Sequence, residues 1–385
     1  MTKLASLVPG PLRQVWDQAR KRLFLLWDLF REIPWGRVRR FHDRGATTVV
    51  WIHHRYPASW LHYLLREDTI LKDLALVVGL ARAGVPFRIV TGRKIHEVEG
   101  ATVVWTIHPY NPDRNPNYAE GMLGAVRRIE DAGNTLLPSS EEAQWWENKV
   151  YMHQRFDELG VPSPRTVVDR PGGDLSLRCA DGTELGFPLL VKEPHSQGSA
   201  GLHKVATIED LRRLRAEMLR RGESELLLQE LIDMGRDLRV TLVGDRVVHH
   251  YFRINTSDEW QPTSTRRGSQ VDFVTFPEKW RQQIVDVFRS TGMRTGAFDI
   301  CWRGDDLDTE PLFLEVSPSY TPNPPPPPAF ADRPYYQFKK QLTGPDSFGS
   351  AFVRIVFDIQ AQVLDEWGIT RDGGSSATRG GRDQL

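Results

Sequence analysis

Two short apolar segments near residue 300 constrain this chain more than any other part of its sequence. Residues 296–302 and 311–318 each have the length and apolar character of a buried strand, and the polar turn 303–310 joins them. The first strand contains Asp299, and the second contains Glu315. An antiparallel pairing of the two strands would place these acids beside each other.

Two neighbouring carboxylates repel each other unless a cation lies between them. Carboxylate oxygens suit Mg²⁺, which usually takes water and nucleotide phosphates as its other ligands. Ser317 follows Glu315 by two residues, so the two side chains should point to the same face of the strand. The alternative is a hairpin with two solvated acids, and the hairpin alone does not decide between these interpretations.

Length and composition restrict the class of protein. The chain has 385 residues, which predicts two domains or one large domain in a soluble protein. Its 50 lysines and arginines balance 50 aspartates and glutamates, so the net charge indicates neither nucleic acid nor a membrane as partner. The two cysteines, Cys179 and Cys301, form no disulfide framework or zinc cluster and fit a reducing cytoplasm. We expect no stable membrane insertion and no signal peptide, because no apolar run has the required length or pattern.

The first 40 residues are predicted to be an amphipathic helical extension, with a helix over 11–33. Its apolar stripe is surrounded by arginines, which is typical of a helix that binds a membrane surface or a partner. Acidic residues dilute the basic face, so we favour the alternative that the helix packs on its own first domain. The stripe consists of Trp16, Leu23, Leu26, Trp27 and Phe30.

Residues 41–139 are predicted to form an open α/β sheet domain. Strands and helices alternate there with the spacing of strand–helix–strand units. The dinucleotide fingerprint GxGxxG is absent, so we do not expect this domain to bind a nucleotide on its own. The expected strands are 47–52, 85–90, 101–107 and 135–137, and the expected helices are 68–83 and 117–132.

The second domain is predicted to span 140–366, followed by a disordered tail over 367–385. It begins with one helix over 141–159 and continues with a strand that ends near Lys192. The glycine- and serine-rich turn 195–201 follows this strand, and its backbone N–H groups suit phosphate oxygens. It lacks the GK[ST] of a Walker loop. Further along, two strands form a hairpin that turns at Gly244-Asp245.

The order of these features resembles the ATP-grasp superfamily, and within it the glutamate-adding carboxylate–amine ligases. The resemblance covers roughly 134–320 and more loosely the domain before it. It implies an α/β chain in which an open α/β sheet domain precedes a two-subdomain ATP-grasp module, with the lid over about 162–228.

The resemblance also assigns the nucleotide site. Lys149 and Lys192 match the phosphate-binding lysines; Gln197, Gly198, Ser199 and Gly201 match the loop that closes over the phosphates; Gln229, Glu230 and Ile232 match the adenine hinge; and Asp237 matches the ribose-binding acid.

Four arginines match positions that touch phosphate or carboxylate oxygens. Arg239 resembles an arginine near the terminal phosphates, and Arg253 with Arg266 or Arg267 resembles those that contact the acyl phosphate and the carboxylate substrate. The bidentate guanidinium fork suits such oxygens. The alternative for Arg253, Arg266 and Arg267 is a solvated basic loop.

Asp299, Glu315 and Ser317 match the metal-binding positions, although the superfamily commonly has Asn where this chain has Ser317. The resemblance implies an ADP-forming ligase that uses ATP and Mg²⁺, for which Mn²⁺ could substitute. Its substrates would be a carboxylate and an amine, either small molecules or peptides. No nucleic-acid partner is expected, and a homodimer is left open. The alternatives are a kinase with a hydroxyl acceptor and a non-catalytic nucleotide-binding module.

Overall fold

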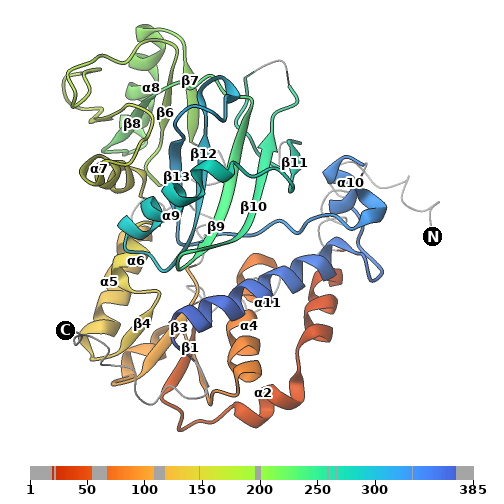
Figure 1. Cartoon of the computed structure of the whole chain (residues 1–385). Coiled ribbons are helices and arrows are strands. Elements are labelled where there is room, and N and C mark those ends of the chain that lie inside the picture. Colours follow the sequence, from red (N-terminus) through yellow and green to blue (C-terminus); the bar gives the residue numbers. More distant parts are fainter. Residues whose placement is uncertain are drawn as a thin grey trace, which may run out of the picture.

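The structure is a computed structural model, in which the described residues form three β-sheets (Figure 1). It describes residues 20, 23–53, 67–107, 118–146, 148–195, 201–257, 260–265, 268–331 and 333–369.

The first sheet is parallel, and its strands have the order β2-β1-β3-β4. Apolar residues fill β1 and β3 almost continuously, as is typical of strands covered on both faces, and Val49, Val50 and Val103 are fully buried. The predicted α/β class is therefore confirmed. The elements are β1 (Thr48–Ile52), α4 (Glu67–Ala83), β2 (Arg88–Thr91), β3 (Thr102–Trp105), α5 (Tyr118–Asp131) and β4 (Thr135–Leu137).

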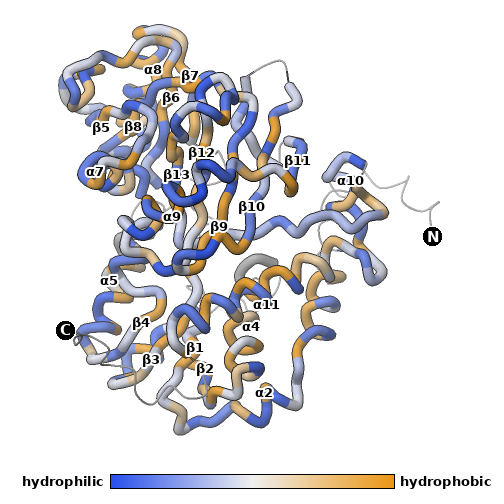
Figure 2. The backbone as a smooth tube through the Cα atoms, in the orientation of Figure 1, coloured by the Kyte–Doolittle hydropathy of each residue, from blue (hydrophilic) through white to orange (hydrophobic). Residues whose placement is uncertain are grey.

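Helices from both ends of the described chain cover this sheet. The C-terminal helix α11 (Phe348–Glu366) packs along α4, and Figure 2 shows hydrophobic residues along both helices. The two approach closely at Gly79, where an added Cβ would lie 2.4 Å from Leu364 Cδ1. Residues 23–32 are also helical, and Leu25 and Leu29 pack into the same core cluster as Phe352 of α11. The described part of the N-terminal helix thus packs on its own first domain.

The prediction of one continuous helix over 141–159 is wrong, because the structure has two helices there. Helix α6 (Ser140–Gln144) ends before a pair of buried tryptophans, and α7 (Lys149–Leu159) begins after them. Trp145 packs into the core of the second domain, whereas Trp146 packs into the core of the first. A continuous helix could not serve both cores. Asn148 caps the new helix by accepting a hydrogen bond from the Tyr151 N–H.

The second sheet is antiparallel and contains β5 (Thr166–Asp169), β6 (Leu189–Lys192), β7 (Leu202–Val205) and β8 (Leu226–Glu230). Its order is β5-β8-β6-β7, and α8 (Ile208–Arg220) packs against it. We call this unit the lid sheet. It has a hydrophobic core of its own, in which Leu189, Val191 and Leu228 are fully buried.

The third sheet has five antiparallel strands in the order β11-β10-β9-β12-β13. Asp299 of β12 pairs with Glu315 of β13, which confirms the predicted register. The strands are β9 (Arg236–Val243), β10 (Arg246–Ile254), β11 (Gln270–Asp272), β12 (Thr295–Cys301) and β13 (Leu312–Ser317), and α9 (Arg281–Ser290) packs on them.

The described part of the chain also contains shorter helical elements. They are α2 (Trp35–Phe41), α10 (Tyr335–Lys339) and the 3-10 turns η2 (Gly92–Glu97), η3 (Glu278–Trp280), η4 (Arg303–Asp305) and η5 (Pro328–Phe330). None of the helices in the described residues combines the length and the apolar character needed to span a membrane.

Candidate active site

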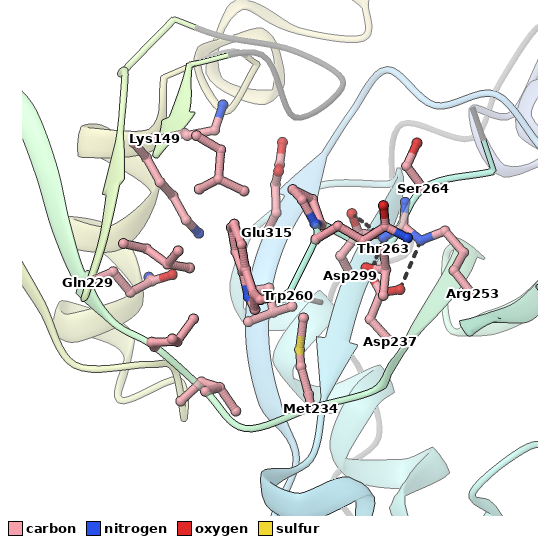
Figure 3. A pocket seen from close by; sticks show the side chains of 18 of the residues that line it. Lys149, Gln229, Met234, Asp237, Arg253, Trp260, Thr263, Ser264, Asp299 and Glu315 are labelled. Atoms are coloured by element: carbon pink, nitrogen blue, oxygen red, sulfur yellow. Dashed lines mark hydrogen bonds and ion pairs between the residues drawn. The ribbon is translucent and has the colours of Figure 1, made fainter. Parts of the chain in front are cut away.

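A cavity of about 220 Å³ lies between the lid sheet and the five-stranded sheet. Figure 3 shows Lys149 and Gln229 on one side of it and the side chains of Asp237, Arg253 and Asp299 on the other. Its lining contains the two predicted phosphate-binding lysines, the two predicted metal-binding acids and an apolar wall. The polar lining includes Lys149, Lys192, Gln229, Glu230, Asp237, Arg239, Arg253, Asp299 and Glu315, and the apolar lining includes Leu190, Leu202, Leu231, Ile232, Met234, Trp260 and Leu314.

The two lysines reach the cavity from different elements that are joined at one point. Lys149 is the first residue of α7, and its N–H donates to the Pro194 carbonyl just beyond the end of β6. Lys192 is the last residue of β6. Burial lowers the pKa of Lys192 to about 8, while the carboxylate of Glu315 opposes this shift and Lys149 adds to it. An anionic ligand between these lysines would relieve their mutual repulsion.

Gly201 meets the end of β6 at a place where only glycine fits. Its φ is +67°, and an added Cβ would lie 2.7 Å from the Glu193 carboxyl carbon. The Glu193 N–H donates to the Gly201 carbonyl over 2.8 Å. Gly201 lines the cavity as expected of the closing loop, whereas the predicted loop residues Gln197, Gly198 and Ser199 lie outside the described residues.

The predicted hinge follows β8 along the cavity. Gln229 is 1% exposed, and its amide nitrogen lies 3.3 Å from His153 Nε2 and 3.1 Å from Thr166 Oγ1. Burial lowers the pKa of His153 well below its ordinary value, and Lys192 and Lys149 act in the same direction. His153 is therefore neutral near pH 7 and can accept the hydrogen bond from Gln229.

Glu230 has a structural function in addition to its place in the lining. Its carboxylate accepts hydrogen bonds from the backbone and guanidinium of Arg165 and from Arg303. Its N–H donates to the Arg165 carbonyl, so this group is already used. Ile232 is 6% exposed and lies in the same wall as Leu231. The Glu230 N–H is therefore not available to a ligand in the cavity.

Two arginines and two aspartates form an ion-pair cluster at the other side of the cavity. Arg239 donates to both oxygens of Asp299 over 2.7 Å, and Arg253 contacts Asp299 over 2.9 Å. Arg253 also donates to both oxygens of Asp237, which is 1% exposed. The four formal charges cancel. Burial alone would raise the pKa of Asp299, but the two guanidiniums hold it well below its ordinary value.

This cluster changes the interpretation of two predicted residues. Asp237 lines the cavity, but its carboxylate holds Arg253, so the structure gives it a different partner from the predicted ribose. Arg239 is likewise held by Asp299. Arg253 lies within β10, not in the loop where we expected it, because this strand extends to Ile254. Arg266 and Arg267 lie outside the described residues.

Glu315 is the acid of the site that stands apart from this cluster. Its half-buried side chain lines the cavity, and within the described part of the chain no hydrogen bond or ion pair engages its carboxylate. The paired Asp299 is 8% exposed, with both oxygens occupied by arginine. Glu315 is therefore the carboxylate most available to a cation.

Ser317 does not contribute to the cavity lining, contrary to our expectation of a residue beside a metal. Its hydroxyl donates to the Ser319 carbonyl over 2.7 Å and accepts the Ser319 N–H over 3.2 Å. These bonds close the turn that follows β13. No group of three or more His, Cys, Asp or Glu side chains arranged to hold a metal occurs among the described residues.

Apart from Ile232, the apolar wall of the site was not predicted from the sequence. Met234 and Trp260 come from loops, where single apolar residues carry no periodic signal, and Leu314 belongs to a strand in which apolar side chains are expected in the core. The wall lies beside Gln229 and the hinge (Figure 3). A flat aromatic ligand would be sheltered from water there.

The chain has the ATP-grasp fold, as the sequence led us to expect. The structure is similar to that of D-alanine–D-alanine ligase from Bacillus anthracis complexed with ATP, with a TM-score of 0.52 and 13% identity over 84% of this chain and 99% of that one. It is also similar to D-cycloserine synthetase, with a TM-score of 0.50 and 13% identity over 81% of this chain and 99% of that one. No protein-family profile matches the chain.

The sequence of the chain is similar to those of a beta-citrylglutamate synthase and of D-alanine–D-alanine ligases. The chain is 28% identical to beta-citrylglutamate synthase B of Danio rerio over 186 residues, which cover 48% of this chain and 45% of the relative. It is 27% identical to D-alanine–D-alanine ligase of Xylella fastidiosa over 207 residues, covering 51% of this chain and 63% of the relative. The chain thus spans less than two thirds of the length of these relatives.

Proposed function

We propose that this chain is an ATP-dependent carboxylate–amine ligase that forms an amide bond through an acyl phosphate. One observation supports this most directly: within an ATP-grasp fold, a single cavity places Lys149 and Lys192 on the lid side and Glu315 with Asp299 on the other. The similarity to D-alanine–D-alanine ligases and beta-citrylglutamate synthase points in the same direction.

ATP and Mg²⁺ fit the chemistry of the lining. Lys149 and Lys192 would bind phosphate oxygens, and the apolar wall with the hinge would enclose adenine. Glu315 would hold Mg²⁺ or Mn²⁺, and Asp299, the residue paired with it in the sheet, would add a second carboxylate to the site. A bound Mg²⁺ would neutralise phosphate charge during transfer.

The reaction needs no covalent nucleophile from the protein. A substrate carboxylate oxygen forms a bond to the terminal phosphorus of ATP, and ADP leaves. An amine then forms a bond to the acyl carbon, and inorganic phosphate leaves. Arg239 and Arg253, which Asp299 and Asp237 hold in place, would bind the carboxylate and the developing charge on the phosphoryl group. We further propose that 140–366 forms the catalytic module, with its lid over about 162–228.

The acyl phosphate gives the sharpest test. Purified protein would be incubated with Mg-ATP, hydroxylamine and a library of small-molecule and peptide carboxylates. We expect release of ADP together with a hydroxamate for the true carboxylate, and an amide when the matching amine replaces hydroxylamine. If the library also contains hydroxyl compounds, ADP with a stable phosphate ester of one of them and no hydroxamate would instead identify a kinase. Binding of ATP without turnover of any carboxylate would point to a non-catalytic module.

The lowered pKa of Lys192 leads us to expect that nucleotide binding depends on pH. Its pKa of about 8 in the free protein should rise when phosphate oxygens surround it, because opposite charge favours the protonated form. Between the two pKa values, binding takes up a proton, so affinity falls as pH rises. From pH 7 to pH 9 we expect the dissociation constant of Mg-ATP to increase about tenfold, measured by calorimetry.

The matched control is Lys192→Arg, which keeps its charge throughout this range. This variant should show only the shallow dependence that arises from ATP itself, and Lys192→Ala should bind weakly at every pH. Equal slopes for the wild type and Lys192→Arg would show that Lys192 does not contact the phosphates.

A further inference from the structure

An exposed apolar face runs along the N-terminal helix and continues onto α2. Leu23, Trp27 and Phe30 follow one another at spacings of four and three residues, which places them on one side of a helix. Their exposed fractions are 63%, 68% and 41%, and that of Trp35 in α2 is 47%. These four, which we call the aromatic face, are four of the nine large hydrophobic side chains that are exposed in the described part of the chain.

The aromatic face is held in place. The opposite side of the same helix, with Leu25 and Leu29, is buried against α11 and fixes the helix to the domain. Phe30 and Trp35 stack with their ring centroids 5.8 Å apart, and the Trp35 indole N–H donates to the Phe30 carbonyl over 3.0 Å. Two rings are thereby kept at the surface in a fixed arrangement, which reduces the entropy lost on binding.

The surrounding charge is strongly positive. Between Arg20 and Arg44 the chain has eight basic and three acidic residues, a net charge of +5, whereas the whole chain has a net charge of zero. Of the acids, Asp28 is 6% exposed and Glu32 lies beside Arg31. The described arginines of this stretch are all exposed, namely Arg20, Arg31, Arg37, Arg39, Arg40 and Arg44.

We propose that the aromatic face and its arginines bind the surface of an anionic lipid bilayer. Tryptophan and phenylalanine favour the boundary between headgroups and acyl chains, and arginines attract anionic headgroups. A second copy of the chain fits less well, because a symmetric contact would bring two surfaces of net charge +5 together. In Figure 1, α2 lies at the opposite end of the molecule from the lid sheet, so membrane contact would leave the lid free.

Vesicle flotation tests this proposal with the full chain. Vesicles of phosphatidylcholine alone and vesicles that also contain phosphatidylglycerol would be compared at low salt. We expect binding to the anionic vesicles only, with loss of binding at high salt. The double variant Leu23→Gln/Trp27→Gln should lower the partition coefficient at least tenfold, and Arg39→Gln/Arg40→Gln should lower it on anionic vesicles by a similar factor.

Leu219→Gln is the matched control, because Leu219 is a helical residue of α8 with 50% exposure, far along the chain in the lid. It should bind vesicles like the wild type, and circular dichroism should confirm that all variants are folded. Equal binding to neutral and anionic vesicles, equal loss in the control, or no vesicle binding at all would overturn the proposal. A dimer that Leu23→Gln/Trp27→Gln dissociates, without vesicle binding, would assign the face to self-association.

Discussion

Replacing Glu315 with glutamine is expected to leave the fold intact and to lower ADP formation about 10²–10³-fold. The amide has nearly the volume of the carboxylate but no charge, so a cation and the phosphates around it would be left under-neutralised. The fold should tolerate the change because, within the described residues, no ion pair or hydrogen bond holds this side chain. Initial rates at saturating Mg-ATP would be compared with thermal unfolding curves.

Glu310→Gln supplies the control for charge alone. Glu310 is exposed in the turn between β12 and β13, and its carboxylate contacts only the Gln283 amide among the described residues. It removes the same charge at a short distance along the chain and should change the rate little. Near-normal ADP release by Glu315→Gln would refute the proposed metal ligand.

Asp299→Asn is expected to abolish turnover and to destabilise the fold by about 3–5 kcal/mol. The amide cannot compensate the charges of Arg239 and Arg253, which are largely buried beside it. Urea denaturation at neutral pH would measure the loss. Because the arginines hold the pKa of Asp299 below its unfolded value, this stability is present above about pH 4 and is lost as pH falls through the folded pKa.

Asp286→Asn is the corresponding surface control. Asp286 is exposed and pairs with Arg289 over 2.8 Å, and an exposed pair of this kind contributes at most about 1 kcal/mol. If Asp299→Asn were no more destabilising than this control, the arginine–aspartate cluster would not stabilise the fold in solution.

The pairing of Asp299 with Glu315 could be predicted from the sequence, because each acid interrupts an apolar strand and the strands are joined by a short turn. The arginine partners of Asp299 and Asp237 could not be predicted from the sequence. Arg253 lies opposite Asp237 because a β-bulge shifts the β9–β10 register between Val247 and His249. A regular hairpin would place Phe252 there. Bulges leave no reliable pattern in a single sequence.

The break between α6 and α7 shows the same limit. The sequence over 141–159 has no proline or glycine that would end a helix. The chain turns because Trp145 and Trp146 enter different hydrophobic cores, and this depends on contacts distant in sequence. The break decides the position of Lys149, which becomes the first residue of a helix next to the end of β6. The local sequence pattern thus predicted that Lys149 belongs to the site, but its position depends on tertiary packing.

The return of α11 to the first domain has a consequence for synthesis on the ribosome. Leu364 of α11 lies in a core cluster of the parallel sheet, whereas Ile359 and Val363 pack on Val243 of β9. The first domain emerges from the ribosome long before this helix, so its α4 surface stays uncovered until residues 348–366 have been made. The first domain therefore reaches its native packing only after residues 140–347 and α11 have been translated.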